Sequence, residues 1–396
     1  MLKQWLQRRR TPGPEPVAPA LPIDLEAPAF IADPYPTYAW LREHAPTADV
    51  AQGGVLLTRH SDITDALTNR ALGNTPSRIS VLNARNAGKY TAAALAANIP
   101  PFLDKPAHTA VRQPLSTAFF AAFKSHVEGL PALADAMVAQ APITGFAIAD
   151  IARPFACAAM ARLIGLPGDP LSYAPLSEAF FHLFAPVRDP ARFAEVNATL
   201  ARFQEGIQSG IADAPEASLI ANLRESPLSA EAIADNAILV FADGIENIQA
   251  AFVTLLRHRE ARPAFASTEG FVREVLRRET PAQIIPRVTV EEITLLGRTL
   301  LQGHPVFLAL GSAGRDTSVF DAPDELRADR PEQNTLIFGG GRHRCVGEIL
   351  GVALLTTLFD VAAQASLSLS STTSASFEPR MGHRWEVDTQ YHRASR

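Results

Sequence analysis

The chain has 396 residues, and 47% of them are hydrophobic, which is enough to bury a sizeable core. Its formal net charge of −5 and its pI near 6.1 argue against a nucleic-acid partner, because nucleic-acid binders usually present a basic face. The two cysteines, Cys157 and Cys345, do not make a disulfide framework or a zinc site, and they favour a reducing, cytoplasmic setting.

The N-terminus and the hydropathy pattern define the expected boundaries of the fold. No run of about 18 consecutive apolar residues occurs, so we expect no transmembrane helix and no membrane partner. The first ten residues are basic but lack the apolar core of a secretory signal, and residues 11–22 are rich in Pro and Ala. We therefore interpret residues 1–20 as a flexible tail and expect residues 21–396 to form a single domain of a monomeric protein.

The first predicted helix lies between Pro34 and Pro46, with Tyr38 and Leu41 on its buried face. A strand is predicted next over 55–58, and a helix follows it with Ser61 as the expected N-cap. Further helices are predicted from the apolar periodicity over 107–123, 131–139, 154–164, 176–184, 190–211 and 230–257. Strand-like runs return over 288–296 and 305–310, so the fold class is mainly α with a minor β-sheet region.

The most informative segment is a glycine-rich loop that ends in a cysteine. Three glycines allow a tight backbone that can approach a flat cofactor, and a helical run begins just after Cys345. A thiolate at a helix N-terminus is stabilised by the helix dipole and by unpaired N–H groups. The spacing of the loop is carried by Phe338, Gly341, His343, Cys345 and Gly347.

This spacing resembles the cysteine-ligand signature of the cytochrome P450 superfamily, and the chain as a whole resembles its soluble bacterial members. The resemblance extends from about Asp33 to the helix after Cys345. It implies the cytochrome P450 fold, a haem b cofactor (iron protoporphyrin IX), and the thiolate of Cys345 as the axial metal ligand. Cys157 lies in an apolar run and is expected to be a small buried hydrophobe.

A second motif of that family, Glu-x-x-Arg, is matched by Glu274 and Arg277. Residues three apart share a helix face and can pair, and in the family this pair supports the cysteine loop. A third, basic partner normally comes from the segment before that loop. The family often has Arg where Glu325 stands, so Arg327 or Arg330 must take its place, and the sequence does not choose between them.

Four basic residues occupy the family's usual positions for binding the two haem propionates, which are anions satisfied by basic side chains. His108 and Arg112 are four apart at a predicted helix start, so they face the same way. Arg287 and His343 occupy the remaining positions. For each residue alone a surface role would be the default, and the set gains its meaning from the resemblance.

The predicted helix around residues 237–248 is apolar nearly all round until three polar residues interrupt it. Asp243, Glu246 and Asn247 are spaced i, i+3, i+4 and share one stripe, where a buried carboxylate is costly without a partner or a function. The family has a Gly-x-acid-alcohol sequence here, which relays protons. Gly244 and Glu246 match it, whereas Asn247 stands in place of the alcohol. The alternative is a polar patch at a helix bend.

The resemblance implies an oxygen-dependent monooxygenase that takes electrons from NAD(P)H through a separate ferredoxin and ferredoxin reductase. The expected substrate is a small organic molecule of secondary-metabolite type, and the sequence does not identify which one. One alternative is haem-thiolate chemistry of another kind, namely peroxide-driven oxidation, oxidative coupling or rearrangement. A third reading, a haem sensor without turnover, is disfavoured by the Asp243 and Glu246 carboxylates, because passive binding needs no proton relay.

Overall fold

The computed structural model describes residues 18–140, 144–147, 149–184, 189–331, 335–365, 367–369, 376–380, 383–387 and 390–393. The predicted flexible tail lies outside the described residues except for its last three positions. The chain is mainly helical with small sheets, as predicted. The α-helices are α1 Pro28–Ala32, α2 Tyr35–His44, α3 His60–Thr68, α4 Arg78–Asn86, α5 Thr91–Ala96, α6 Ala107–His126, α7 Leu130–Gln140, α8 Ala149–Ile164, α9 Ala174–Phe181, α10 Pro190–Gly210, α11 Leu219–Arg224, α12 Ala230–Arg257, α13 Thr268–Arg278, α14 Leu310–Ala313 and α15 Glu348–Gln364.

The strands form one larger sheet and three small ones. They are β1 Thr47–Asp49, β2 Val55–Leu57, β3 Leu72–Gly73, β4 Thr144–Ala147, β5 Ile284–Thr289, β6 Ile293–Leu295, β7 Arg298–Leu300, β8 Pro305–Ala309, β9 Leu367–Leu369, β10 Ser376–Arg380, β11 His383–Val387 and β12 Gln390–Arg393. The larger sheet has the order β1-β2-β8-β5-β3, in which only the β2–β8 pair is parallel. The others are β10-β11, β4-β12-β9 and β6-β7.

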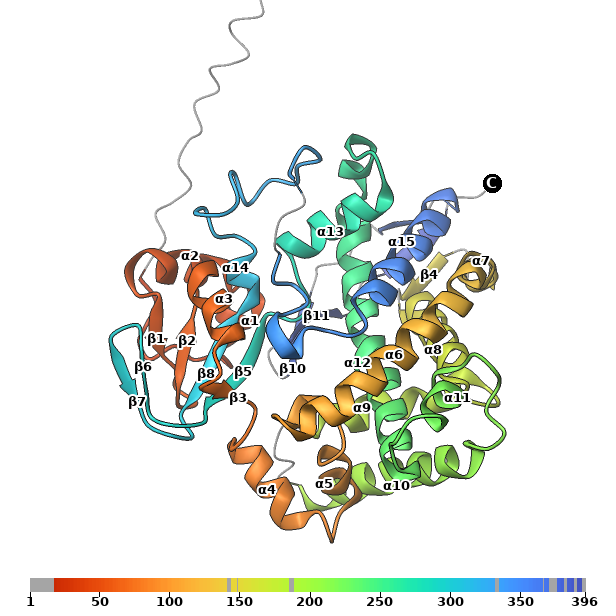
Figure 1. Cartoon of the computed structure of the whole chain (residues 1–396). Helices are drawn as coiled ribbons and strands as arrows, with labels where there is room; N and C mark the ends of the chain where they lie inside the picture. The colour runs from red at the N-terminus through yellow and green to blue at the C-terminus, as the bar shows by residue number, and fades with distance from the viewer. Residues whose placement is uncertain are drawn as a thin grey trace, which may run out of the picture.

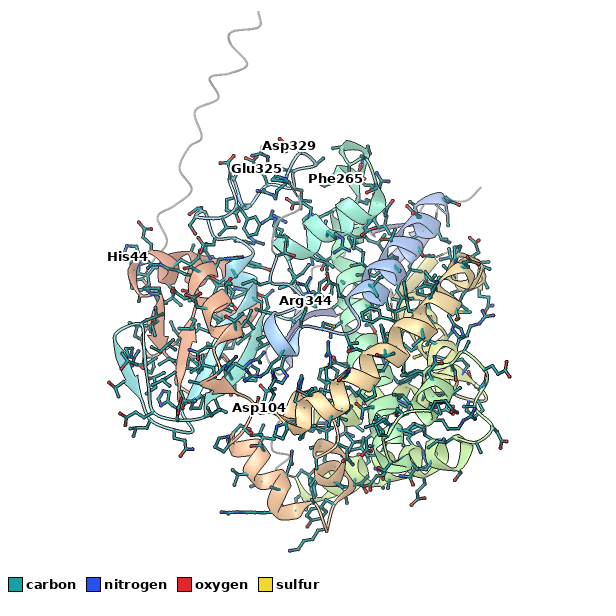
Figure 2. All side chains as sticks on the ribbon, in the orientation of Figure 1. His44, Asp104, Phe265, Glu325, Asp329 and Arg344 are labelled. Atoms are coloured by element: carbon teal, nitrogen blue, oxygen red, sulfur yellow. The ribbon has the colours of Figure 1, made fainter. Side chains whose placement is uncertain are left out.

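The two kinds of structure occupy different parts of the molecule (Figure 1). The larger sheet and helices α2, α3 and α14 lie together on one side of the molecule, and most of the long helices lie on the other side of the molecule. α12 runs through the helical part, with α8, α9, α10 and α15 packed around it. The segment that leads into α15 lies where the two parts meet, as the labels of Arg344 and Asp104 show in Figure 2.

α12 is the central helix of the fold. It begins after Ser229, whose side chain accepts a hydrogen bond from the Ala232 amide, and it carries Glu231 in its first turn and Arg257 in its last. This arrangement satisfies an unpaired N–H and complements the helix dipole. By length and composition α12 could cross a membrane, but 72% of its most apolar window is buried inside the protein, which is typical of a core helix.

The prediction that Ser61 caps α3 is wrong. The helix begins two residues earlier than that cap implies, at His60, and the Arg59 side chain in the N-cap position makes no capping bond. The backbone amide of His60 instead donates to Oδ2 of Asp316 at 2.8 Å, a residue 256 positions away in the sequence. A tertiary contact has therefore replaced the local cap.

Candidate active site around Cys345

The backbone of the cysteine loop is fixed by its own hydrogen bonds and by α3. The Cys345 amide donates to the Phe338 carbonyl at 2.9 Å, which closes the loop into a compact turn. Gly339 and Gly341 have φ of 68° and 61°, in the left-handed region that favours glycine. A Cβ at Gly341 would also lie 2.3 Å from the Leu67 carbonyl oxygen. This glycine is therefore required by the packing of the loop on α3.

The sulfur of Cys345 lies at the start of α15, as predicted. Gly347 is the N-cap residue of that helix, and its backbone N–H donates a hydrogen bond to the Cys345 sulfur. Burial and, after it, the charge of Asp243 raise the pKa of the free thiol to about 11, while the Gly347 bond and the Arg112 charge act in the opposite direction. A metal cation at the sulfur would reverse this balance, because a coordinating thiol is deprotonated.

Cys345 and Asp243 of α12 face the same internal space. Both side chains keep solvent-accessible surface. Burial nevertheless raises the pKa of Asp243 to about 6, as it raises that of the thiol. The two accessible side chains are close enough for the charge of Asp243 to act on the thiol, and we call the space that they border the hollow.

The four predicted propionate ligands are brought together at this hollow. The rings of His108 and His343 are in edge contact, with centroids 4.3 Å apart. Nη2 of Arg112 donates to the carbonyl of Arg344 at 2.5 Å, and burial lowers the pKa of Arg112. Burial, followed by the charge of a neighbouring arginine, lowers the pKa of Arg287 to about 10. These basic side chains therefore form one group, in which burial and then the charges of His343 and Arg112 lower the pKa of His108.

Two members of this group were not predicted. Asp104 accepts hydrogen bonds from the Asn74 and Thr75 amides at 2.7 and 2.9 Å, and it pairs with Arg342 at 3.2 Å. Burial alone would raise the pKa of Asp104, but the hydrogen bonds from His343 and these amides hold it below its usual range. The signal was present, since Asp104 comes just before Lys105-Pro106 and Arg342 lies inside the glycine loop.

The Glu-x-x-Arg pair is buried, and its third partner is Arg330. Arg277 Nε donates to Glu274 Oε2 at 2.8 Å, and Arg330 Nε donates to Glu274 Oε1 at 3.0 Å. Arg327 contributes only its backbone amide to Glu274, at 3.1 Å. Its guanidinium lies at the protein surface, where it donates hydrogen bonds to the carboxylates of Asp321 and Asp329. Of the two arginines that the sequence left open, Arg330 is therefore the one that pairs with Glu274.

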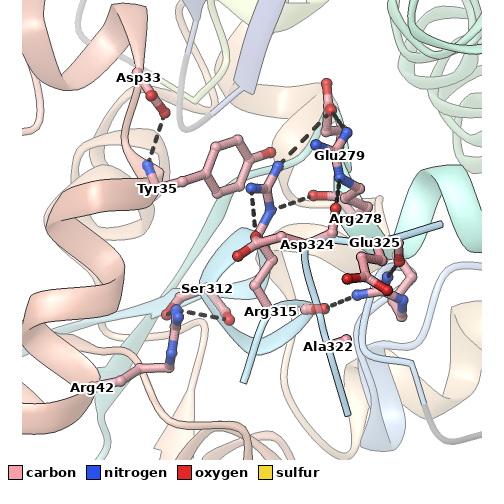
Figure 3. A network of polar contacts seen from close by, with 12 residues as sticks. Asp33, Tyr35, Arg42, Arg278, Glu279, Ser312, Arg315, Ala322, Asp324 and Glu325 are labelled. Atoms are coloured by element: carbon pink, nitrogen blue, oxygen red, sulfur yellow. Dashed lines mark hydrogen bonds and ion pairs between the residues drawn. The ribbon is translucent and has the colours of Figure 1, made fainter. Parts of the chain in front are cut away.

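A second polar network lies at the C-terminal end of α13 (Figure 3). The guanidinium of Arg315 lies over the ring of Tyr35, with Cζ 3.4 Å from the ring centroid, and it pairs with Asp324 at 3.0 Å. Arg278 donates to the Asp324 carbonyl at 2.7 Å and also pairs with Glu279. Together these contacts tie the segment after α14 to α2 and α13.

On α12, the three polar residues of the predicted stripe differ in their surroundings. Glu246 is buried, with 6% of its surface exposed, whereas Asp243 is accessible from the hollow. Nδ2 of Asn247 donates to the Asp243 carbonyl at 2.9 Å. Oδ1 of Asn247 is buried and has no hydrogen-bond partner among the described residues. The side-chain amide of Asn247 therefore has an unused acceptor, Oδ1, while Nδ2 already donates one hydrogen bond.

These residues fit an iron porphyrin. A sulfur that receives a backbone N–H is a suitable axial ligand. Arg112 and Arg287 form no ion pair with any described carboxylate, and the buried Nε2 of His108 has no hydrogen-bond partner among the described residues. Such groups are satisfied by the carboxylates of a bound cofactor. In the part of the chain that the structure describes, no three His, Cys, Asp or Glu side chains form an alternative metal cluster.

Comparisons with known proteins agree with this geometry. The family model described as Cytochrome P450 matches residues 222–359. "Cytochrome P450 BJ-3" of Bradyrhizobium diazoefficiens is 29% identical over 369 residues, which cover 82% of this chain and 85% of that protein. "Putative cytochrome P450 133B1" of Xylella fastidiosa is 26% identical over 377 residues, which cover 85% and 90%.

The fold has close counterparts among solved structures. The crystal structure of CalO2 matches with a TM-score of 0.85 at 22% identity, over 94% of this chain and 98% of that chain. The family model and the curated relatives point to the same family as the cysteine loop, and the solved structure has the same fold. The chain belongs to the cytochrome P450 superfamily and is a monooxygenase-type oxidoreductase.

Proposed function

We propose that residues 21–396 form one haem-thiolate catalytic domain, which uses dioxygen to oxidise a small organic molecule of secondary-metabolite type. Electrons would come from NAD(P)H through an external ferredoxin and ferredoxin reductase, and the protein would act as a cytoplasmic monomer. The observation that carries the proposal is the arrangement around one internal hollow. The Cys345 sulfur, with its Gly347 N–H, and the carboxylate of Asp243 both face it.

The residues of the hollow divide the work between holding the cofactor and handling protons. Cys345 would hold the iron, while His108, Arg112, Arg287 and His343 would hold the propionates. When bound, the haem supplies the activation of dioxygen and the transfer of one oxygen atom to the substrate.

Proton handling is assigned to the stripe on α12. The Glu246 carboxylate would take up and release the proton, because its burial keeps it out of bulk water while its acid–base chemistry remains available. Asn247 cannot relay its own proton as a hydroxyl does. Its buried Oδ1 can accept a hydrogen bond from a water molecule or from a polar group of the substrate, which would then complete the relay.

A second candidate function is favoured by the same Asn247. Its side-chain amide donates to the Asp243 carbonyl, and the position offers no hydroxyl proton. An enzyme that works poorly with dioxygen and electrons but well with peroxide would fit that arrangement. Product formed with peroxide alone, at a higher rate than with NADPH, ferredoxin and ferredoxin reductase, would select this alternative.

The cysteine ligand is tested by optical spectroscopy of the reduced protein with carbon monoxide. We expect the absorption band typical of thiolate-ligated haem, and we expect Cys345→Ala to abolish it because the axial thiolate is lost. Cys157→Ala is the matched control, since Cys157 is fully buried in the core and burial raises its pKa to about 11. Survival of the band in Cys345→Ala would reject the assignment.

A further inference from the structure

Asp243 has an environment that proton transfer does not explain. Its carboxylate faces the hollow, and the structure gives it no hydrogen-bond or ion-pair partner among the described residues. Burial raises its pKa, and no described cation opposes that shift. The Cys345 sulfur, which also faces this space, carries negative charge when it is ionised.

The turn of α12 that carries Asp243 is packed on both sides. Cε of Met160 in α8 lies against Gly244, where an added Cβ would come within 2.4 Å of it. Ser177 of α9 donates a hydrogen bond to the Ala242 carbonyl at 3.1 Å. α8 and α9 therefore hold this turn in place, and the Asp243 side chain between these contacts stays accessible.

Another aspartate of the same helix shows how this fold satisfies a buried carboxylate. Asp235 is fully buried, and it accepts hydrogen bonds from Asn98 Nδ2 at 2.8 Å and from Gln204 Nε2 at 2.6 Å. Asp243, eight residues later, receives nothing comparable from the described chain. A substrate that fills the hollow displaces water from this carboxylate, which is costly without a partner, and a cationic group on the substrate removes that cost.

We propose that Asp243 is a specificity-determining residue that binds a positively charged nitrogen of the substrate, so that the preferred substrates are amines or quaternary ammonium compounds. This inference rests on the proposed function, because it assumes that the substrate occupies the hollow above the haem. A cation there would neutralise Asp243 and orient the rest of the molecule toward the reacting centre. Glu246 would then remain the acid that handles protons.

The test compares two probes of the same shape in the haem-loaded ferric protein. Benzyltrimethylammonium is permanently charged and has no lone pair with which to ligate the iron, and neopentylbenzene is its neutral carbon isostere. Dissociation constants would be measured by calorimetry, supported by the optical change on probe binding. We expect wild-type protein to bind the ammonium probe at least about tenfold more tightly than the neutral one.

Substitutions then assign the preference to a residue. Asp243→Asn should bring the ratio of the two dissociation constants close to one, and Asp243→Glu should keep the preference. Asp235→Asn is the matched control, since it removes a carboxylate from the same helix and should leave the ratio unchanged. Because the readout is a ratio, a general loss of affinity in any variant cancels.

Three results would overturn the inference. The first is a wild-type preference for the ammonium probe of less than about fivefold in dissociation constant, whatever the absolute affinity. The second is an unchanged preference in Asp243→Asn, and the third is a preference that is lost in Glu246→Gln instead. The carbon monoxide band separates this inference from the proposed function. A protein with a normal band and no cation preference retains the function and refutes the role of Asp243, whereas a protein without the band fails at the proposed function itself.

Discussion

At the scale of single residues, the candidate site combines a protonated thiol with two arginines, Arg112 and Arg287, that form no ion pair with any described carboxylate. Burial keeps the free thiol of Cys345 neutral at pH 7, since its pKa is raised to about 11. Iron binding must therefore release a proton, and the affinity for the cofactor depends on pH. Burial, followed by the charge of the nearby His343, lowers the pKa of His108 to about 4. In the protein without its cofactor, His108 is thus neutral at pH 7.

The proton-handling roles can be separated by two substitutions on α12. Glu246→Ala should lower the rate of product formation by about 10²-fold or more, because a positioned acid–base group is lost. Asn247→Thr should retain activity, since a hydroxyl can replace the amide at this position. Steady-state rates with dioxygen and an external ferredoxin system measure both. Full activity in Glu246→Ala would show that the proton takes another route.

The cations can be tested without any substrate. In the Arg112→Ala, Arg287→Ala double variant, each lost charge-assisted hydrogen bond should cost about 1.5–3 kcal/mol of haem binding. The rate of haem transfer to apomyoglobin reports this loss directly. Arg85→Ala is a suitable control, because Arg85 is an exposed residue of α4. Equal transfer rates in the double variant and the wild type would remove the propionate assignment.

At the scale of elements, the pair on α13 depends on which arginine the following loop turns inward. Arg330 is inside, bonded to Glu274, and its guanidinium also lies 5.7 Å from the ring centroid of Phe320. Arg327 is bonded to Asp321 and Asp329 at the surface. The same residue type, three positions apart, therefore has a buried structural role in one case and a solvated one in the other.

This difference predicts opposite outcomes for the same substitution. Arg330→Ala should destabilise the protein by about 3–5 kcal/mol and reduce haem incorporation, because it leaves part of the Glu274 charge buried and unpaired. Arg327→Ala should cost no more than about 1 kcal/mol, as is usual for exposed ion pairs. Denaturant unfolding and the haem-to-protein ratio measure the two effects. Normal haem loading in Arg330→Ala, with loss in Arg327→Ala, would reverse the assignment.

The same contrast shows where sequence reasoning ends. Cys345 and the Glu274–Arg277 pair could be predicted because each motif is contiguous, and Tyr38 and Leu41 are buried as their spacing indicated. Partners from distant segments could not be predicted. The choice of Arg330 and the capping of α3 by Asp316 both depend on the path of loops far away in the sequence. The short helices α4 and α5 were missed as well, because they lack a long apolar period.

At the scale of the whole molecule, one polar network connects three parts of the helical region. Asp235 of α12 accepts hydrogen bonds from Asn98, which follows α5, and from Gln204 of α10. The segment before Asn98 also contacts α10 directly. The Ala92 amide donates to Asn197 Oδ1 at 3.1 Å, and the rings of Tyr90 and Phe193 lie 4.8 Å apart in edge contact.

The segment around α5 and helix α10 therefore contact each other directly, and both are hydrogen-bonded to α12 through the Asp235 carboxylate.

Because that carboxylate is titratable, the stability of the whole assembly should depend on pH. Burial raises the pKa of Asp235 from 3.8 to about 6, and its hydrogen bonds from Asn98 and Gln204 only partly oppose the shift. Between these two values the folded protein binds more protons than the unfolded chain, so the free energy of unfolding falls as pH rises and levels off above about 6. The full shift corresponds to at most about 3 kcal/mol.

Asp235→Asn should therefore flatten the pH dependence of the unfolding free energy between pH 4 and 6 relative to wild type. Denaturant unfolding at several pH values measures the slope, and the difference between the two proteins isolates Asp235 from the similar contribution of Asp243. Asp65→Asn, which changes an exposed carboxylate of α3, should leave the slope as it is. An equal slope in wild type and Asp235→Asn would mean that Asp235 does not exchange a proton on unfolding, and it would reject the raised pKa as a source of pH-dependent stability.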